Sequence, residues 1–223
     1  LSQIPDARTA CVEALETEST FESLMNFVRM AIGMILVATG NPGYAYMQGA
    51  ITAKEAKAIG VNITFSPVMD VNNNQSNPII NFRSYGDDPI AVAEYGCNFI
   101  KGTQDNGLIA CAKHYPGHGN TSVDSHSSLP VIGDTYESLM EIEFYPFKRA
   151  VETGVKMIMT GHIALPAIDS TLLPASHSSA ITNDILREKW GFDGIIVTDG
   201  LEMGGLTKQS WAGESAIRAI EAG

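Results

Sequence analysis

The chain has 223 residues, of which 44% are hydrophobic and 17% are charged, so it is predicted to be globular with ample core material. Its formal net charge of −11 argues against a surface that binds nucleic acid or an anionic membrane. The longest apolar run, residues 31–38, is far too short to span a membrane.

The first regular elements predicted along the chain are a strand, a helix and a second strand. The apolar, β-rich run at residues 61–70 predicts the first strand. A helical pattern follows, in which Asp88 is the expected N-cap, Pro89 takes the first helical position and Gly107 lies just beyond the end. A second apolar run at residues 107–114 predicts the next strand.

The alternation of helix and strand continues to the C-terminal part of the chain. The next elements are predicted to be a helix at 146–154, a strand at 155–162, a helix at 182–191 and a strand at 194–199. Strands that alternate with helices favour a parallel sheet with helices packed outside it, and about five strands are expected in all. Near-continuous apolar runs are typical of strands that are buried on both faces.

Polar side chains stand where these predicted strands end. Asp70, Lys113, His114, His162 and Asp199 all lie at carboxyl ends of strands. In a (β/α) barrel and in an open α/β sheet alike, ligands bind at that edge. The sequence therefore predicts a pocket built by several strands.

The segment KHYPGHGNTSVDSHSSLP, residues 113–130, allows three interpretations on its residues alone. It can be a polar surface loop. It can be a metal site, with ligands from His114, His118, Asp124 and His126. Pro116 and Gly117 exclude the helical pair of histidines that many zinc enzymes use. It can also perform acid/base chemistry, because Asp124 and His126 lie on one side of an extended segment and a carboxylate orients a neighbouring imidazole.

This segment resembles the signature of glycoside hydrolase family 3, in its β-N-acetylhexosaminidase (NagZ-like) branch, where K-H-F-P-G-H-G is followed after about four residues by D-S-H. Other stretches also resemble motifs of that branch. They are FSPVMDVNNN (65–74), NFRSYGDDP (81–89), MTGHIALPAID (159–169) and GFDGIIVTDGLEM (191–203). The resemblance implies a (β/α)8 TIM-type barrel, incomplete in this chain, as a single domain over residues 1–223.

For catalysis, the resemblance implies that Asp199 is the nucleophile that attacks the anomeric carbon. His126, held by Asp124, would be the general acid/base in place of a second carboxylic acid. A retaining glycosidase needs a carboxylate against its oxocarbenium-like transition state and a proton donor at the leaving oxygen. An imidazole has an ordinary pKa near 6.5, which suits the second role. The reaction requires no metal and no cofactor.

For binding, the resemblance implies that Lys113, His114 and Arg83 hydrogen-bond the sugar. Asp70 would line or brace that pocket. His162 would contact the ligand or satisfy buried backbone groups. The family's D-x-E-G-G motif has no clear counterpart, and its nearest match places Glu16 at the aspartate position.

The expected function is that of a retaining exo-β-N-acetylglucosaminidase, acting on saccharides derived from peptidoglycan or chitin through a covalent glycosyl-enzyme intermediate. A β-glucosidase and a β-N-acetylglucosaminide phosphorylase are alternatives within the family, and an inactive sugar-binding module and a metal-dependent hydrolase are alternatives outside it. The expected partner is a carbohydrate, and the oligomeric state stays open. Three cysteines without a CxxC spacing are expected to be free thiols, which slightly favours the cytoplasm. A secreted or envelope location would follow if a leader preceded the chain.

Overall fold

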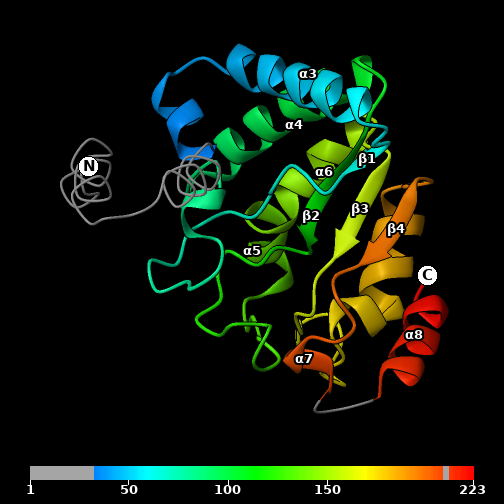
Figure 1. Cartoon of the computed structure of the whole chain (residues 1–223). Helices are drawn as coiled ribbons and strands as arrows, with labels where there is room; N and C mark the ends of the chain where they lie inside the picture. Colours follow the sequence, from blue (N-terminus) through cyan, green and yellow to red (C-terminus); the bar gives the residue numbers. More distant parts are fainter. Residues whose placement is uncertain (1–32, 208–210) are drawn as a thin grey trace, which may run out of the picture.

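The computed structural model describes residues 33–207 and 211–223, and helices and strands alternate along them (Figure 1). In chain order the elements are α3 (Gly43–Ala58), β1 (Ile63–Thr64), η1 (Asn81–Arg83), α4 (Pro89–Asp105), β2 (Ile109–Tyr115), α5 (Tyr136–Glu141), α6 (Phe144–Glu152), β3 (Met157–Thr160), η2 (Ala175–His177), η3 (Ala180–Lys189), β4 (Ile195–Thr198), α7 (Gly204–Thr207) and α8 (Ala212–Glu221). Within the described residues, no helix is long and apolar enough to cross a membrane.

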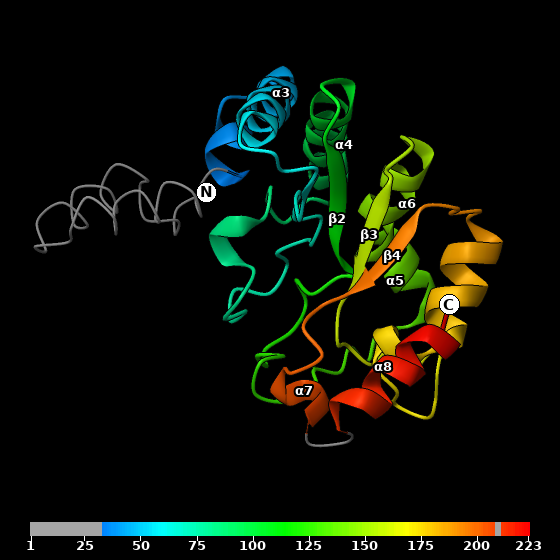
Figure 2. The ribbon, with the colours of Figure 1, turned by 45° about the vertical axis from the view of Figure 1, so that its right-hand side comes forward.

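The four strands form one parallel sheet in the order β1-β2-β3-β4, with α4 and α6 along one of its faces (Figures 1 and 2). Strand order that equals chain order, with helices as the crossovers, is what successive βα units of a barrel produce. The predicted parallel sheet is thus confirmed, although the described residues contain four strands where about five are expected.

The first predicted strand is much shorter than its apolar run. Only Ile63 and Thr64 form β1, yet the chain beyond them still runs beside β2. The amide of Cys111 donates to the carbonyl of Ser66 at 2.9 Å, and the amide of Lys113 donates to the carbonyl of Pro67 at 3.1 Å. Pro67 has no N–H to return a hydrogen bond, so the ladder is interrupted at this residue, and the pairing resumes at the parallel bridge between Val68 and Lys113.

Helix α4 begins and ends as its sequence predicts. The side chain of Asp88 accepts a hydrogen bond from the amide of Ile90, Pro89 is the first helical residue, and Gly107 follows the end with φ +78°. Helix α6 and the π-helix η3 each begin two residues before the predicted positions, at Phe144 and Ala180. Both differences lie within the usual uncertainty of helix ends.

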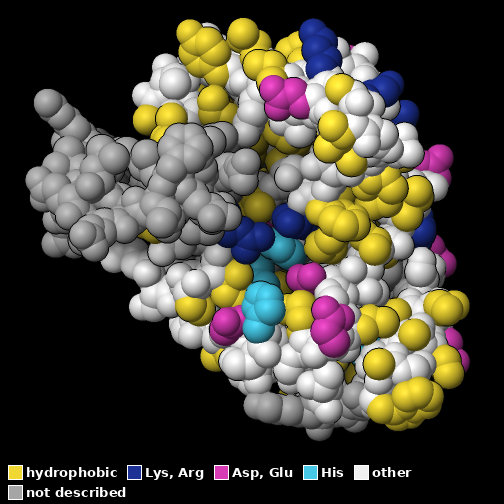
Figure 3. Space-filling view, in the orientation of Figure 1, with side chains coloured by type: hydrophobic (Ala, Val, Ile, Leu, Met, Phe, Trp, Pro, Cys, Tyr) yellow, Lys and Arg dark blue, Asp and Glu magenta, His cyan; other side chains and the backbone are white. Residues whose placement is uncertain are grey.

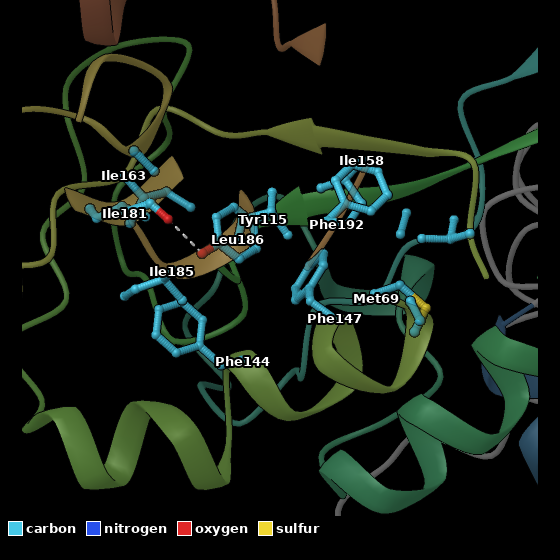
Figure 4. Packing of buried hydrophobic residues seen from close by; sticks show 14 of the residues in the cluster. Met69, Tyr115, Phe144, Phe147, Ile158, Ile163, Ile181, Ile185, Leu186 and Phe192 are labelled. Carbon is cyan, nitrogen blue, oxygen red and sulfur yellow. Dashed lines mark hydrogen bonds between the residues drawn. The ribbon is translucent and has the colours of Figure 1, made fainter. Parts of the chain in front are cut away.

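The main core lies between the sheet and its helices, around a group of aromatic side chains. Tyr115 stacks on Phe144 with ring centroids 5.7 Å apart and meets the edges of Phe147 and Trp190. Its hydroxyl donates to the buried carbonyl of Ile181 at 2.8 Å, which fixes η3 against β2 (Figure 4). Burying a polar tip with a partner in this way avoids the cost of an unsatisfied hydroxyl.

We call the opposite face of the sheet the inner face. It carries a smaller apolar cluster. Its members are Ile109, Cys111, Met157, Met159 and Val197. Side chains alternate between the two faces along a strand, so the next residues on the inner face of β2 and beyond β4 are Lys113 and Asp199. This alternation sends an amine and a carboxylate to the same side of the sheet at its carboxyl end.

Cys97 and Cys111 are free thiols, as expected, and burial raises the pKa of the Cys111 thiol to about 12. Cys11 and Glu16 lie outside the described residues.

Candidate active site

A cavity of about 170 Å³ opens at the carboxyl ends of β2 and β4. It is lined by Ile79, Arg83, Lys113, His114, His118, Ser125, His126 and Asp199. Figure 3 shows histidine side chains between basic and acidic ones in a hollow of this face. The fold therefore brings together predicted site residues from three separate stretches of the sequence.

Lys113 and Asp199 reach the cavity from the inner face of two strands, β2 and β4, that lie on either side of β3. Asp199 follows β4, and its amide donates to the carbonyl of Thr160 at 2.9 Å, which extends the pairing of β4 with β3. Burial and the nearby Arg83 guanidinium lower the pKa of the Lys113 amine, while the Asp199 carboxylate opposes that shift. Asp199 is the only carboxylate among the residues that line this cavity in the described part of the chain.

Asp70 lies behind the cavity and holds the start of the 113–130 segment. Its fully buried carboxylate accepts hydrogen bonds from Nδ1 of His114 at 2.8 Å and from the amide of His118 at 2.7 Å. Burial raises the pKa of Asp70, but attraction to His114 and His118 and their hydrogen bonds outweigh it, so the pKa is lowered overall. An ionised carboxylate only accepts, so Nδ1 of His114 carries the proton and Nε2 is left for other contacts.

Asp124 and His126 form the predicted pair. One carboxylate oxygen of Asp124 lies 2.7 Å from Nδ1 of His126 and 2.8 Å from its amide nitrogen. The hydrogen bond from the backbone N–H of His126 is the main cause that lowers the pKa of Asp124. The ionised carboxylate therefore holds the proton on Nδ1, which leaves Nε2 as the ring atom that can exchange a proton with a ligand.

His162 lies beneath the cavity wall and is 1% exposed. Its Nε2 donates to the carbonyl of Gly200 at 2.9 Å, and its Nδ1 lies 2.9 Å from the hydroxyl of Ser176. Burial lowers the pKa of His162, so the ring is neutral and Nδ1 accepts from Ser176. This placement favours the second expectation for His162, a partner for buried backbone next to Asp199, and its contact with a ligand stays a prediction.

The sequence did not single out two residues that line the cavity. Ser125 and Ile79 contribute to its wall, as does His118, which the sequence offered as a metal ligand or as part of a polar loop. The presence of three histidines, His114, His118 and His126, within one short segment was the available signal. It could not be used, because which histidines face a ligand depends on the path of a loop without regular structure.

The described residues hold no group of three or more His, Cys, Asp or Glu side chains arranged to bind a metal ion. Of the ligands considered for a metal site, His118 uses both ring nitrogens on hydroxyl groups. We therefore expect dialysis against EDTA to leave turnover of an aryl glycoside within about twofold of the untreated protein, since no catalytic metal would be lost. Metal content measured before and after dialysis is the control. A loss of turnover that an added divalent ion restores would contradict this prediction.

A comparison with protein families identifies this architecture. The model of the glycosyl hydrolase family 3 N-terminal domain matches residues 20–223. The chain belongs to glycoside hydrolase family 3. The resemblance found in its motifs is thus confirmed, and the parallel sheet is part of a (β/α)8 TIM-type barrel.

Several known proteins are similar to most of the chain. It is 34% identical to beta-hexosaminidase A of Pseudoalteromonas piscicida, over 87% of this chain and 34% of that protein. It is 33% identical to a beta-N-acetylglucosaminidase/beta-glucosidase of Cellulomonas fimi, over 91% of this chain and 37% of that protein. The solved structure of a family 3 beta-N-acetylglucosaminidase from Paenibacillus sp. str. FPU-7 matches with 42% identity and a TM-score of 0.83, over 87% of this chain and 36% of that one. The chain thus spans about a third of the length of these relatives.

Proposed function

We propose that the protein is a retaining exo-β-N-acetylglucosaminidase, with its reaction centre in the cavity at the ends of β2 and β4. One observation carries the proposal: Asp199 and His126 line the same cavity, although 72 residues separate them in the sequence. A carboxylate and an oriented imidazole on one cavity supply the nucleophile and the proton donor that this reaction requires. The beta-hexosaminidase and beta-N-acetylglucosaminidase relatives support the same assignment.

In the first step, an oxygen of Asp199 attacks the anomeric carbon, and the bond from that carbon to the leaving oxygen breaks. His126 gives its Nε2 proton to that oxygen, so the alcohol leaves neutral and a glycosyl ester remains. In the second step, Nε2 takes a proton from water, whose oxygen attacks the anomeric carbon and releases Asp199. Two inversions at this carbon retain its configuration.

The rest of the cavity would hold the sugar ring. Lys113 and Arg83 supply hydrogen-bond donors, and Nε2 of His114 lies on the same wall. A neutral sugar offers no charge for long-range steering, so directional donors at fixed positions must orient it. Asp70 and His162 support this wall from behind, through His114 and the backbone of Gly200. Saccharides derived from peptidoglycan or chitin carry the terminal β-GlcNAc that this proposal requires.

Hydrolysis of two aryl glycosides tests the sugar specificity. We expect kcat/KM for p-nitrophenyl β-GlcNAc to exceed that for p-nitrophenyl β-glucose by at least about tenfold, because donors placed for the N-acetyl group would lose their partner. Adding inorganic phosphate should not raise the rate. The assay uses the full-length protein, and the anomer of the sugar released first is read by NMR.

The other outcomes each favour one of the alternatives. A preference for the glucoside would indicate a β-glucosidase. Acceleration by phosphate with release of a sugar phosphate would indicate a phosphorylase. Binding of GlcNAc without turnover of either glycoside would indicate an inactive sugar-binding module.

A further inference from the structure

The main chain at Ser125 and His126 is held by groups that the proposed reaction does not use. His118 is 2% exposed and lies between Asp70 and Ser125. Its amide donates to Asp70 at 2.7 Å, its Nδ1 lies 2.7 Å from Oγ1 of Thr121, and its Nε2 lies 2.9 Å from Oγ of Ser125. His118 thus connects the buried base of the cavity with the residue that directly precedes His126.

The hydrogen bonds of Thr121 define how the His118 ring is protonated. The hydroxyl of Thr121 donates its hydrogen to the carbonyl of His118 at 3.0 Å, so its oxygen accepts from Nδ1–H. Burial lowers the pKa of His118, which keeps the ring neutral. Nε2 is then an acceptor, and the hydroxyl of Ser125 donates to it.

A second support comes from the segment after the strand that carries Asp199. The amide of Gly205 donates to the carbonyl of Ser125 at 2.9 Å, and the amide of Gly204 donates to the carbonyl of His126 at 3.0 Å. A Cβ on Gly204 would lie only 2.4 Å from the His126 oxygen, so glycine is required for this approach. Ser125 is therefore held through its side chain and its carbonyl, and His126 through its carbonyl.

These supports matter because the Asp124 and His126 side chains are not fixed by packing. The side chain of His126 is 64% exposed and that of Asp124 is 43% exposed. An exposed imidazole that hydrogen-bonds only within its own segment points wherever the main chain of that segment directs it. The direction of Nε2 of His126 thus depends on the contacts that hold residues 125 and 126.

We propose that His118 and Ser125 are positioning residues, whose hydrogen bond aims Nε2 of His126 at the leaving oxygen. This inference rests on the proposed function. It assigns a role to the second histidine of the K-H-Y-P-G-H-G stretch and to the serine between Asp124 and His126. Neither residue transfers a proton to the substrate.

Ser125→Ala tests this role with little change in volume. We expect kcat/KM to fall about tenfold for a β-GlcNAc disaccharide or other glycoside with a poor leaving group, but less than about threefold for 2,4-dinitrophenyl β-GlcNAc, which leaves without protonation. The parameter kcat/KM reports the glycosylation step, in which His126 acts as an acid. Ser122→Ala, an exposed hydroxyl in the same segment, should match the wild type on both substrates.

A second variant completes a double-mutant cycle. His118→Asn keeps an amide near the position of Nδ1 but has no atom at that of Nε2, so it should show the same dependence on the leaving group. Because both changes break one contact, the double variant should lose no more than either single variant. Melting temperatures of all variants show which of them are folded.

The proposal is overturned if Ser125→Ala matches the wild type, if its loss is equal on both substrates, or if the two single losses multiply in the double variant. The wild-type protein is assayed in the same series. An inactive wild type would refute the proposed function, whereas an active wild type with an unaffected Ser125→Ala variant would refute the positioning role alone.

Discussion

Replacing Asp199 with alanine should reduce kcat/KM by about 10⁴-fold or more, which is the scale of loss when a covalent catalyst lacks its nucleophile. The reason lies in the cavity, where no other carboxylate among the described lining residues can take its place. Steady-state hydrolysis of p-nitrophenyl β-GlcNAc measures the effect. Asp193→Ala, which removes an exposed carboxylate at the opposite end of β4, is the matched control and should retain wild-type turnover.

Chemical rescue with azide distinguishes a missing nucleophile from a damaged fold. Azide added to Asp199→Ala can enter the space of the lost carboxylate and attack the anomeric carbon of an activated aryl glycoside. A single inversion would then give an α-glycosyl azide, whereas the wild-type protein retains the β configuration. Near-wild-type hydrolysis by Asp199→Ala would show that the nucleophile is a different residue.

Replacing His126 with alanine should produce the second largest loss, and its size should depend on the leaving group. For glycosides with poor leaving groups we expect kcat/KM to fall by about 10²–10⁴-fold, the usual contribution of general acid catalysis. For 2,4-dinitrophenyl β-GlcNAc the loss in kcat/KM should stay below about tenfold, because this group departs without a proton. Single-turnover measurements of glycosylation across a series of aryl glycosides test this dependence.

Asp124→Asn belongs in the same series as a milder change. An amide oxygen can still accept from Nδ1 of His126, but it no longer stabilises the protonated ring by charge, so we expect a smaller loss than that of His126→Ala. Ser122→Ala is again the control. Equal impairment of His126→Ala on good and poor leaving groups would assign the proton transfer to another residue.

The part of the site that strands carry could be predicted from the sequence, and the part that depends on loop packing could not. Lys113 lies near the end of one apolar strand and Asp199 directly follows another, and the alternation of side chains along a strand already places each of them opposite the helices. No comparable rule shows that Gly204 meets the carbonyl of His126 or that His118 meets Ser125. Those contacts join segments without regular structure, and only the folded chain brings them together.

Helix α3 was not predicted for a related physical reason. Its sequence has no marked apolar stripe, because it packs on α4 through glycines rather than through large side chains. A Cβ at Gly49 would lie 2.3 Å from the carbonyl of Phe99, and one at Gly102 would lie 2.0 Å from the carbonyl of Tyr46. The two helices therefore meet backbone to backbone, and such a contact leaves little hydrophobic periodicity to detect.

The cavity wall carries more basic than acidic side chains, whereas the protein as a whole is acidic. Lys113 and Arg83 face one carboxylate, Asp199, in a chain whose formal net charge is −11. A neutral sugar does not respond to this difference in charge, but small anions are attracted to the basic side chains of the cavity. We therefore expect buffer anions to compete with the sugar for the cavity, and a higher ionic strength to weaken that competition by screening. The apparent KM in an amine buffer with chloride should then differ from that in sulfate.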